Sequence, residues 1–316
     1  EAVRTVVRGS KDVSRRIDAL RVARAWPQSL ARPELLHCLE DRSWLVVAQA
    51  VRGLRDHRAK QVVDALIERM PDAKGRMLED FSDALNELTS QSHGHSAAAW
   101  RIWWRDSKST WEPPASSPSS DEDVEKSLGT AVRQGLYGEI VSERVVFLLD
   151  ISGSMLAETS VGGSRIEVAR TELCRALESG LSPKSRFSVV AFSEGVQRFS
   201  TKLVKAQGAS LKKSIRFVQK LTAGGETNSY GALEAAFADR EVDTIYLLSD
   251  GSPTVGEETS TTLILDAVSR WNRYRGTRIH CYGLFAGEAP RQDEAQAREF
   301  LRRLARSNHG RYTEIR

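Results

Sequence analysis

One carboxylate and two hydroxyl side chains stand at alternate positions directly after a run of apolar residues. In the segment LLDISGSM, residues 148–155, Asp150, Ser152 and Ser154 are separated only by single residues. A buried strand that ends in this way presents three oxygen donors at its carboxyl end. In open α/β sheets, ligands bind at this edge, near the point where the strand order reverses. The segment therefore predicts polar side chains that face a crevice.

Two later segments supply further oxygen donors. AGGETNS, residues 223–229, is a glycine-rich loop before a predicted helix, and LLSDGSPT, residues 247–254, ends another apolar run. We expect five side chains to converge: Asp150, Ser152, Ser154, Thr227 and Asp250. All five offer oxygen and none is a soft ligand. Such a set favours one hard cation, Mg²⁺ or Mn²⁺, over zinc or copper.

The elements that must position these residues alternate between strands and helices. Continuous apolar runs at 144–150, 186–192, 243–250 and 278–285 are typical of parallel strands buried on both faces. Helical patterns lie between and after them, at 165–179, 209–221, 229–239, 261–276 and 295–310. Residues 195–200 suit an antiparallel edge strand, and 311–315 close the chain as a last strand. The pattern predicts a doubly wound, mostly parallel α/β sheet.

The N-terminal part has a different period. Apolar residues recur at three- and four-residue spacings in six segments: 13–25, 32–41, 43–57, 59–70, 75–89 and 96–106. Leu20, Leu54 and Leu85 mark a repeat of about 31 to 34 residues, the period of stacked helix pairs. The stretch resembles HEAT-like repeats, although an unrelated helical bundle would give a similar pattern. We expect an all-α domain before the sheet.

A polar segment separates the two parts. Residues 107–127 are rich in Ser and Pro, carry an acidic cluster and contain almost nothing apolar, as linkers do. We therefore predict helical repeats over 1–106, a linker over 107–135 and the α/β domain over 136–316. No apolar run is long enough to span a bilayer. The chain begins with Glu1, which leaves open a removed leader, and with it a cytoplasmic or an extracytoplasmic location.

The oxygen donors also carry a resemblance to a known family. Asp-x-Ser-x-Ser, a later Thr in a Gly-Gly loop and an Asp-Gly after a buried strand are similar to the metal-ion-dependent adhesion site of von Willebrand factor A domains. The resemblance covers residues 136–316. The lead-in to Asp150 is similar to that of bacterial members in which HEAT-like helices precede the A domain.

The resemblance implies a role for each residue. Ser152 and Ser154 would bind the cation through their hydroxyls, and Thr227 would bind it in the ligand-competent form. Asp150 and Asp250 would act largely through bound water and would orient the serines. A carboxylate of a partner protein would complete the coordination, so partner binding would run through Ser152, Ser154 and Thr227 by way of the metal.

Enzymatic motifs are missing from the sequence. There is no Gly-x-Ser-x-Gly, no Walker A segment and no HExxH. His93 and His95 stand close together, but two histidines without a third ligand nearby are more typical of a polar loop than of a metal site. We expect no catalytic residues and no enzyme.

Two functions remain from different classes. The first is a metal-dependent protein-binding adaptor that grips an Asp or Glu of its partner, with the helical repeats as a second surface. Family members of this kind work beside AAA+ ATPases of the MoxR type or at cell surfaces. The second is an RNA-binding protein of the Ro type, which also joins helical repeats to an A domain. The short helical part, and the lack of a basic stripe with interleaved aromatic residues in the sequence, favour the adaptor.

Overall fold

The computed structural model of the chain describes residues 1–114, 135–159, 162–285 and 292–315. The chain divides into two compact units, residues 1–127 and 128–316, which we call the helical unit and the sheet unit. Within the described residues, no helix has both the length and the apolar character that crossing a membrane requires.

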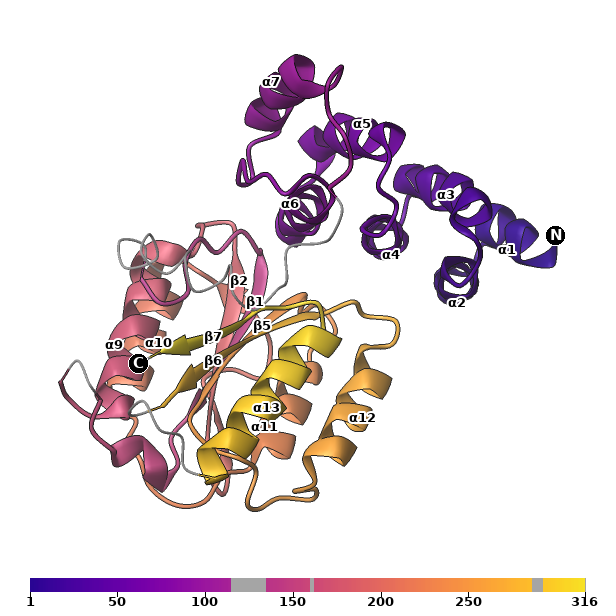
Figure 1. Ribbon diagram of the computed structural model, residues 1–316. Helices are drawn as coiled ribbons and strands as arrows, with labels where there is room; N and C mark the ends of the chain where they lie inside the picture. Colours follow the sequence, from indigo (N-terminus) through magenta and orange to yellow (C-terminus); the bar gives the residue numbers. More distant parts are fainter. Residues whose placement is uncertain (115–134, 160–161, 286–291, 316) are drawn as a thin grey trace. The chain divides into compact units, whose positions relative to one another are not determined.

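The helical unit is built of short helices. They are α1 (Ala2–Gly9), α2 (Val13–Arg24), α3 (Gln28–His37), α4 (Trp44–Leu54), α5 (Lys60–Arg69), α6 (Arg76–Thr89) and α7 (Ala97–Ser107), with single 3₁₀ turns at Cys38–Glu40 and Met70–Asp72. Asp12 and Ser96 cap α2 and α7 by accepting hydrogen bonds from backbone N–H groups of the first turn. Helix α2 packs against α4, and α4 against α6, so that alternate helices form a row (Figure 1).

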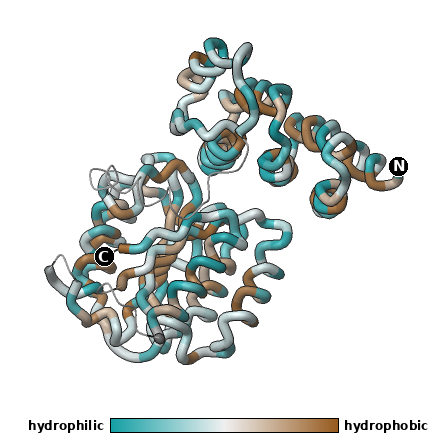
Figure 2. Tube along the Cα trace, in the orientation of Figure 1, coloured by the Kyte–Doolittle hydropathy of each residue, from teal (hydrophilic) through white to brown (hydrophobic). Residues whose placement is uncertain are grey.

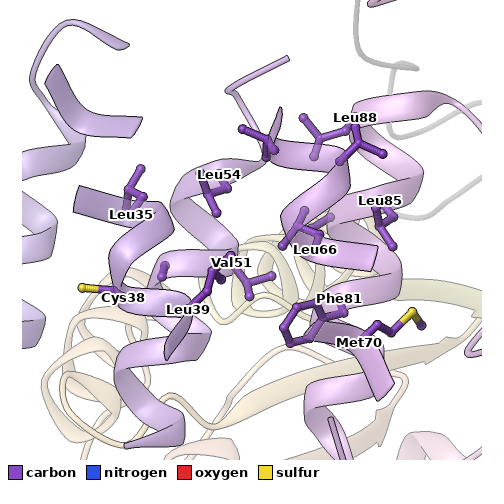
Figure 3. Close-up of a cluster of buried hydrophobic side chains, with 14 of the residues drawn as sticks. Leu35, Cys38, Leu39, Val51, Leu54, Leu66, Met70, Phe81, Leu85 and Leu88 are labelled. Atoms are coloured by element: carbon purple, nitrogen blue, oxygen red, sulfur yellow. The ribbon is translucent and has the colours of Figure 1, made fainter. Parts of the chain in front are cut away.

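The core of the helical unit runs through these helices without a break. Figure 3 shows buried side chains of this cluster spread along the row of helices, from Leu35 of α3 through Leu54 of α4 and Leu66 of α5 to Leu85 and Leu88 of α6. Trp100 is fully buried and Trp111 is 9% exposed, so the packed unit continues past residue 107, where the linker is predicted to begin. The rest of the predicted linker, from 115 to 134, lies outside the described residues. The assignment to HEAT repeats stays a prediction.

The sheet unit alternates strands and helices. Its strands are β1 (Arg144–Asp150), β2 (Arg186–Phe192), β3 (Val196–Arg198), β4 (Val204–Lys205), β5 (Thr244–Ser249), β6 (Arg278–Leu284) and β7 (Tyr312–Ile315). Its helices are α9 (Arg165–Arg175), α10 (Gly208–Gln219), α11 (Ser229–Phe237), α12 (Thr261–Asn272) and α13 (Gln292–Ser307), with a 3₁₀ turn at Gly153–Leu156 and a π turn at Ala176–Gly180. Among the described residues the strand order is β3-β2-β1-β5-β6-β7, and β4 pairs with β2.

Helices cover both faces of this sheet (Figure 1). Because successive side chains of a strand point to opposite faces, Val146 and Leu148 of β1 pack with α11, α12 and α13, whereas Phe147 and Leu149 pack with α9 and α10. Burial on both sides explains why the central strands are almost wholly hydrophobic (Figure 2). All strand pairs are parallel except those that β3 and β4 make with β2.

The predicted fold class is confirmed: a mostly parallel α/β sheet follows an all-helical N-terminal region. The antiparallel edge strand β3 lies at 196–198, within the segment predicted for it. Two short elements, α1 and β4, were not predicted. Strand β1 lies between β2 and β5. The strands that follow β1 in the chain are therefore added first on one side of it, as β2 to β4, and then on the other side, as β5 to β7. The switch in strand order therefore falls at the end of β1, where Asp150 stands.

Candidate functional site

The site begins with the carboxyl ends of β1 and β5, which are paired neighbours in the sheet. Asp150 ends β1 and is fully buried. The hydroxyl of Ser249, the last residue of β5, donates to Asp150 Oδ2 at 2.5 Å, and the backbone N–H of Ser152 donates to Asp150 Oδ1 at 2.8 Å. The aspartate thus fixes the start of the loop that carries the two serines.

The two serine hydroxyls lie together and reach the second aspartate. Ser152 Oγ and Ser154 Oγ are 3.1 Å apart, and Ser154 Oγ donates to Asp250 Oδ1 at 2.7 Å. The backbone N–H of Gly153 donates to the carbonyl of Gly225 at 2.8 Å. This bond ties the serine loop to the glycine-rich loop that carries the threonine.

Thr227 lies beside this group. A Cβ atom placed on Gly251 would be 3.6 Å from Thr227 Oγ1 and 3.8 Å from Ser154 Oγ, so both hydroxyls border the same glycine. The backbone N–H of Thr227 donates to Thr254 Oγ1 at 2.9 Å, and its carbonyl accepts from the Thr254 N–H at 2.9 Å. Glu226, the residue before it, is exposed, whereas Thr227 itself is only 5% exposed.

All five predicted site residues therefore lie at one edge of the sheet. Asp150 is hydrogen-bonded to the serine loop, Ser152 contacts Ser154, and Ser154 bonds Asp250, whereas Thr227 adjoins them without a hydrogen bond to the other four side chains. Their carboxylate and hydroxyl oxygens form a set suited to a hard divalent cation. Their role as metal ligands stays a prediction.

Sequence reasoning missed Arg165. This arginine is 2% exposed and joins two carboxylates: its Nη1 donates to Asp250 Oδ2 at 2.5 Å, and its Nη2 donates to Glu294 Oε1 at 3.1 Å. One oxygen of Asp250 thus faces the arginine and the other faces Ser154. A signal was available, because a cation in the first turn of a helix opposes the helix dipole and needs a partner elsewhere. Its partners, however, are 85 and 129 residues away.

The charge of Asp150 is poorly compensated. No Lys, Arg or His in the part of the chain that the structure describes forms an ion pair with it. Burial raises the pKa of Asp150 to about 7, the nearby Asp250 carboxylate adds to the rise, and the hydrogen bonds from Ser249 and Ser152 oppose it. A buried carboxylate in this position is expected to take up either a proton or a cation.

His93, one of the two histidines considered in the sequence, packs against tryptophans. The ring of His93 lies edge-on against Trp100, with ring centroids 4.7 Å apart, and also contacts Trp103. Among the described residues, no group of three or more His, Cys, Asp and Glu side chains is placed to hold a metal ion. The candidate site differs from such groups because three of its five side chains, Ser152, Ser154 and Thr227, carry hydroxyls.

Known proteins resemble the sheet unit. The von Willebrand factor A domain-containing protein 3A of Homo sapiens is 31% identical over 178 residues, which is 56% of this chain and 14% of that protein. The inter alpha-trypsin inhibitor, heavy chain 4, of Mus musculus is 32% identical over 140 residues, which is 40% of this chain and 14% of that protein. The chain thus spans about a seventh of the length of either relative.

One solved structure and one family profile also match this chain. The von Willebrand factor type A protein from Catenulispora acidiphila is 24% identical, with a TM-score of 0.45, over 56% of this chain and 39% of its own. The profile of the von Willebrand factor type A domain matches residues 143–314, from the residue before β1 to the last but one residue of β7. This match takes in more than half of the chain, which therefore belongs to the von Willebrand factor type A domain family.

Proposed function

We propose that this chain is a divalent-cation-dependent protein-binding module whose metal site takes a carboxylate from a partner protein. Domains of this family mediate protein–protein interactions. The observation that carries the proposal is the pair of buried aspartates beside clustered hydroxyls, of which Asp150 has no cationic partner among the described residues. The donor set fits Mg²⁺ or Mn²⁺.

Each residue has a part in this proposal. Ser152 and Ser154 hold the cation through their hydroxyls, and Thr227 adds a third hydroxyl from the adjoining loop. Asp150 orients the serine loop through the Ser152 N–H, and Asp250 orients Ser154. When bound, the cation supplies a positive charge that attracts a carboxylate. Because three of the five donors are neutral, much of that charge remains available to a partner.

The helical unit contributes a second surface. It carries large apolar side chains that are half exposed, among them Val22 at 51% and Ile102 at 56%. Arrays of short helix pairs bind partners along extended surfaces. In the proposal, the metal supplies the anchor and this unit extends the contact.

The proposal is tested by affinity capture from an extract of the cells that produce the protein. The full chain is immobilised and washed with Mg²⁺ or with excess EDTA, and a Thr227→Ala chain serves as the second bait. We expect a set of proteins that is retained in Mg²⁺, released by EDTA and absent from the variant. Retention of the same proteins under all three conditions would show that the metal site does not bind them.

A further inference from the structure

The loops around the metal site form one continuous face. They comprise the serine loop after β1, residues 193–195 after β2, residues 222–228 before α11 and residues 250–260 after β5. The Gly153 N–H donates to the Gly225 carbonyl at 2.8 Å, and the Asn228 N–H donates to the Ser193 carbonyl at 2.9 Å. Hydrogen bonds between Thr227 and Thr254 join the loop after β5 to the loop before α11. The side chains that project from these loops therefore surround the paired serine hydroxyls.

This face carries negative charge on every loop. Glu158, Glu194, Glu226 and Glu257 belong to the four loops in turn, and all are exposed. Glu194 lies close to the Thr227 loop, because its Oε1 is 3.0 Å from where a Cβ on Gly225 would lie. None of the four glutamates forms a salt bridge with another residue that the structure describes.

Positive charge is missing from the same loops. Their described residues, 151–159, 162–164, 193–195, 222–228 and 250–260, include no Lys or Arg. Arg165 comes directly after the serine loop, but it is buried and already paired with two carboxylates. Lys220 belongs to the end of α10. The face is thus acidic, whereas the chain as a whole has a net charge of +4.

The charge of this face restricts the partner. A carboxylate that reaches the metal must pass between exposed glutamates, and an acidic surface around it would be repelled by them. We propose that the partner is a protein whose metal-binding Asp or Glu stands alone within a basic surface of Lys and Arg. The inference rests on the proposed function, since the metal attracts the carboxylate. The four exposed glutamates, which we call the rim, select the residues around that carboxylate.

An apolar contact adjoins the site as well. Leu156, two residues after Ser154, is 59% exposed although it is a large hydrophobic residue. Aliphatic stems of Lys and Arg cover such side chains while their charged ends reach nearby carboxylates. A basic surface therefore matches both the glutamates and the leucine.

Synthetic peptides test the inference on the full chain. Three peptides of equal length carry one central Asp flanked by Lys, by Ser or by Glu, and a fourth is the Lys peptide with Asn in place of Asp. Fluorescence anisotropy in Mg²⁺ should give the tightest binding for the Lys–Asp peptide and the weakest for the Glu–Asp peptide, at least about tenfold apart at low salt. The difference should shrink as salt is raised to about 0.5 M.

Matched variants distinguish an effect of the rim glutamates from an effect of the net charge of the chain. Glu158→Gln, Glu226→Gln and Glu257→Gln combined should bring the Lys and Ser peptides to similar affinities. The control combines Glu143→Gln, Glu178→Gln and Glu241→Gln, which remove the same charge from exposed positions before β1, β2 and β5, at the opposite edge of the sheet. The control chain should keep the preference of the wild type.

The outcomes distinguish the two proposals. If all three Asp peptides bind equally and only in Mg²⁺, the basic partner is refuted while the metal-dependent function stands. If the Lys–Asn peptide binds as tightly as the Lys–Asp peptide, or if the Lys–Asp peptide binds as tightly in EDTA as in Mg²⁺, the rim attracts basic chains but the metal-dependent function fails. If no peptide binds, or if the control variant loses the preference as the rim variant does, the inference is overturned.

Discussion

Replacing Arg165 by methionine tests how strongly the site depends on its buried cation. The side chains of Arg165, Asp250 and Glu294 are 2%, 0% and 5% exposed. Removing the arginine takes from buried Asp250 its ion pair, whereas Glu294 keeps Arg298 at 3.8 Å. Removing one partner of a buried ion pair typically costs about 3–5 kcal/mol, because the remaining charge is uncompensated. For a unit of this size, 1 kcal/mol corresponds to about 2–4 °C in Tm. Arg165→Met should therefore lower the Tm of the sheet unit by about 6–20 °C.

Differential scanning calorimetry of the full chain measures this change, and a second arginine of α9 provides the control. Arg175 pairs with Glu172 at 2.6 Å but is 53% exposed. Exposed pairs contribute at most about 1 kcal/mol, so Arg175→Met should leave the transition within about 4 °C of the wild type. If Arg165→Met unfolds at the same temperature as Arg175→Met, the buried network does not stabilise the site.

Three further predictions concern the folding of the two units, Thr227 and His57. Residues 1–114 and 135–316 should each fold when expressed alone, which calorimetry would show as one cooperative transition per fragment; a molten sheet fragment would contradict this. Thr227→Ala should lower partner affinity more than Mg²⁺ affinity, measured side by side, and equal losses would count against a direct role of the hydroxyl at the partner. Burial, reinforced by Arg32, lowers the pKa of His57 from 6.5. The unfolded state therefore binds more protons than the folded state as the pH falls through 6.5. The free energy of unfolding of the helical unit, measured in urea, should fall from pH 7.5 to pH 5.5. His57→Gln should make it depend less on pH.

Local patterns were enough to predict the framework of the site. The run 144–150 is almost continuously apolar, which predicts a strand buried on both faces, and β1 lies at the same residues. Asp150 and Asp250 could be placed together because parallel strands end at one edge, so two strand-end residues meet wherever their strands are neighbours. Hydrogen bonds now join these residues to the serines.

The features that were missed depend on contacts or lengths that local sequence patterns do not reveal. Arg165 looks like an ordinary helix residue until the fold brings Asp250 and Glu294 to it. Trp111 looks like part of a polar linker, yet its ring lies edge-on to that of Trp104, with centroids 5.4 Å apart. Helix α1 has only eight residues, too few for a secure apolar period.

Calorimetric titration of Mg²⁺ into the full chain tests the central claim most directly. The comparison is between the wild type, Asp150→Asn and Asp266→Asn, the last being an exposed aspartate of α12. Asparagine keeps the shape of the side chain but removes its charge. The proposed site predicts one Mg²⁺ per chain in the wild type and in Asp266→Asn, and none or at least about tenfold weaker binding in Asp150→Asn. Unchanged Mg²⁺ binding by Asp150→Asn, or no binding by the wild type, would contradict a metal site at the end of β1.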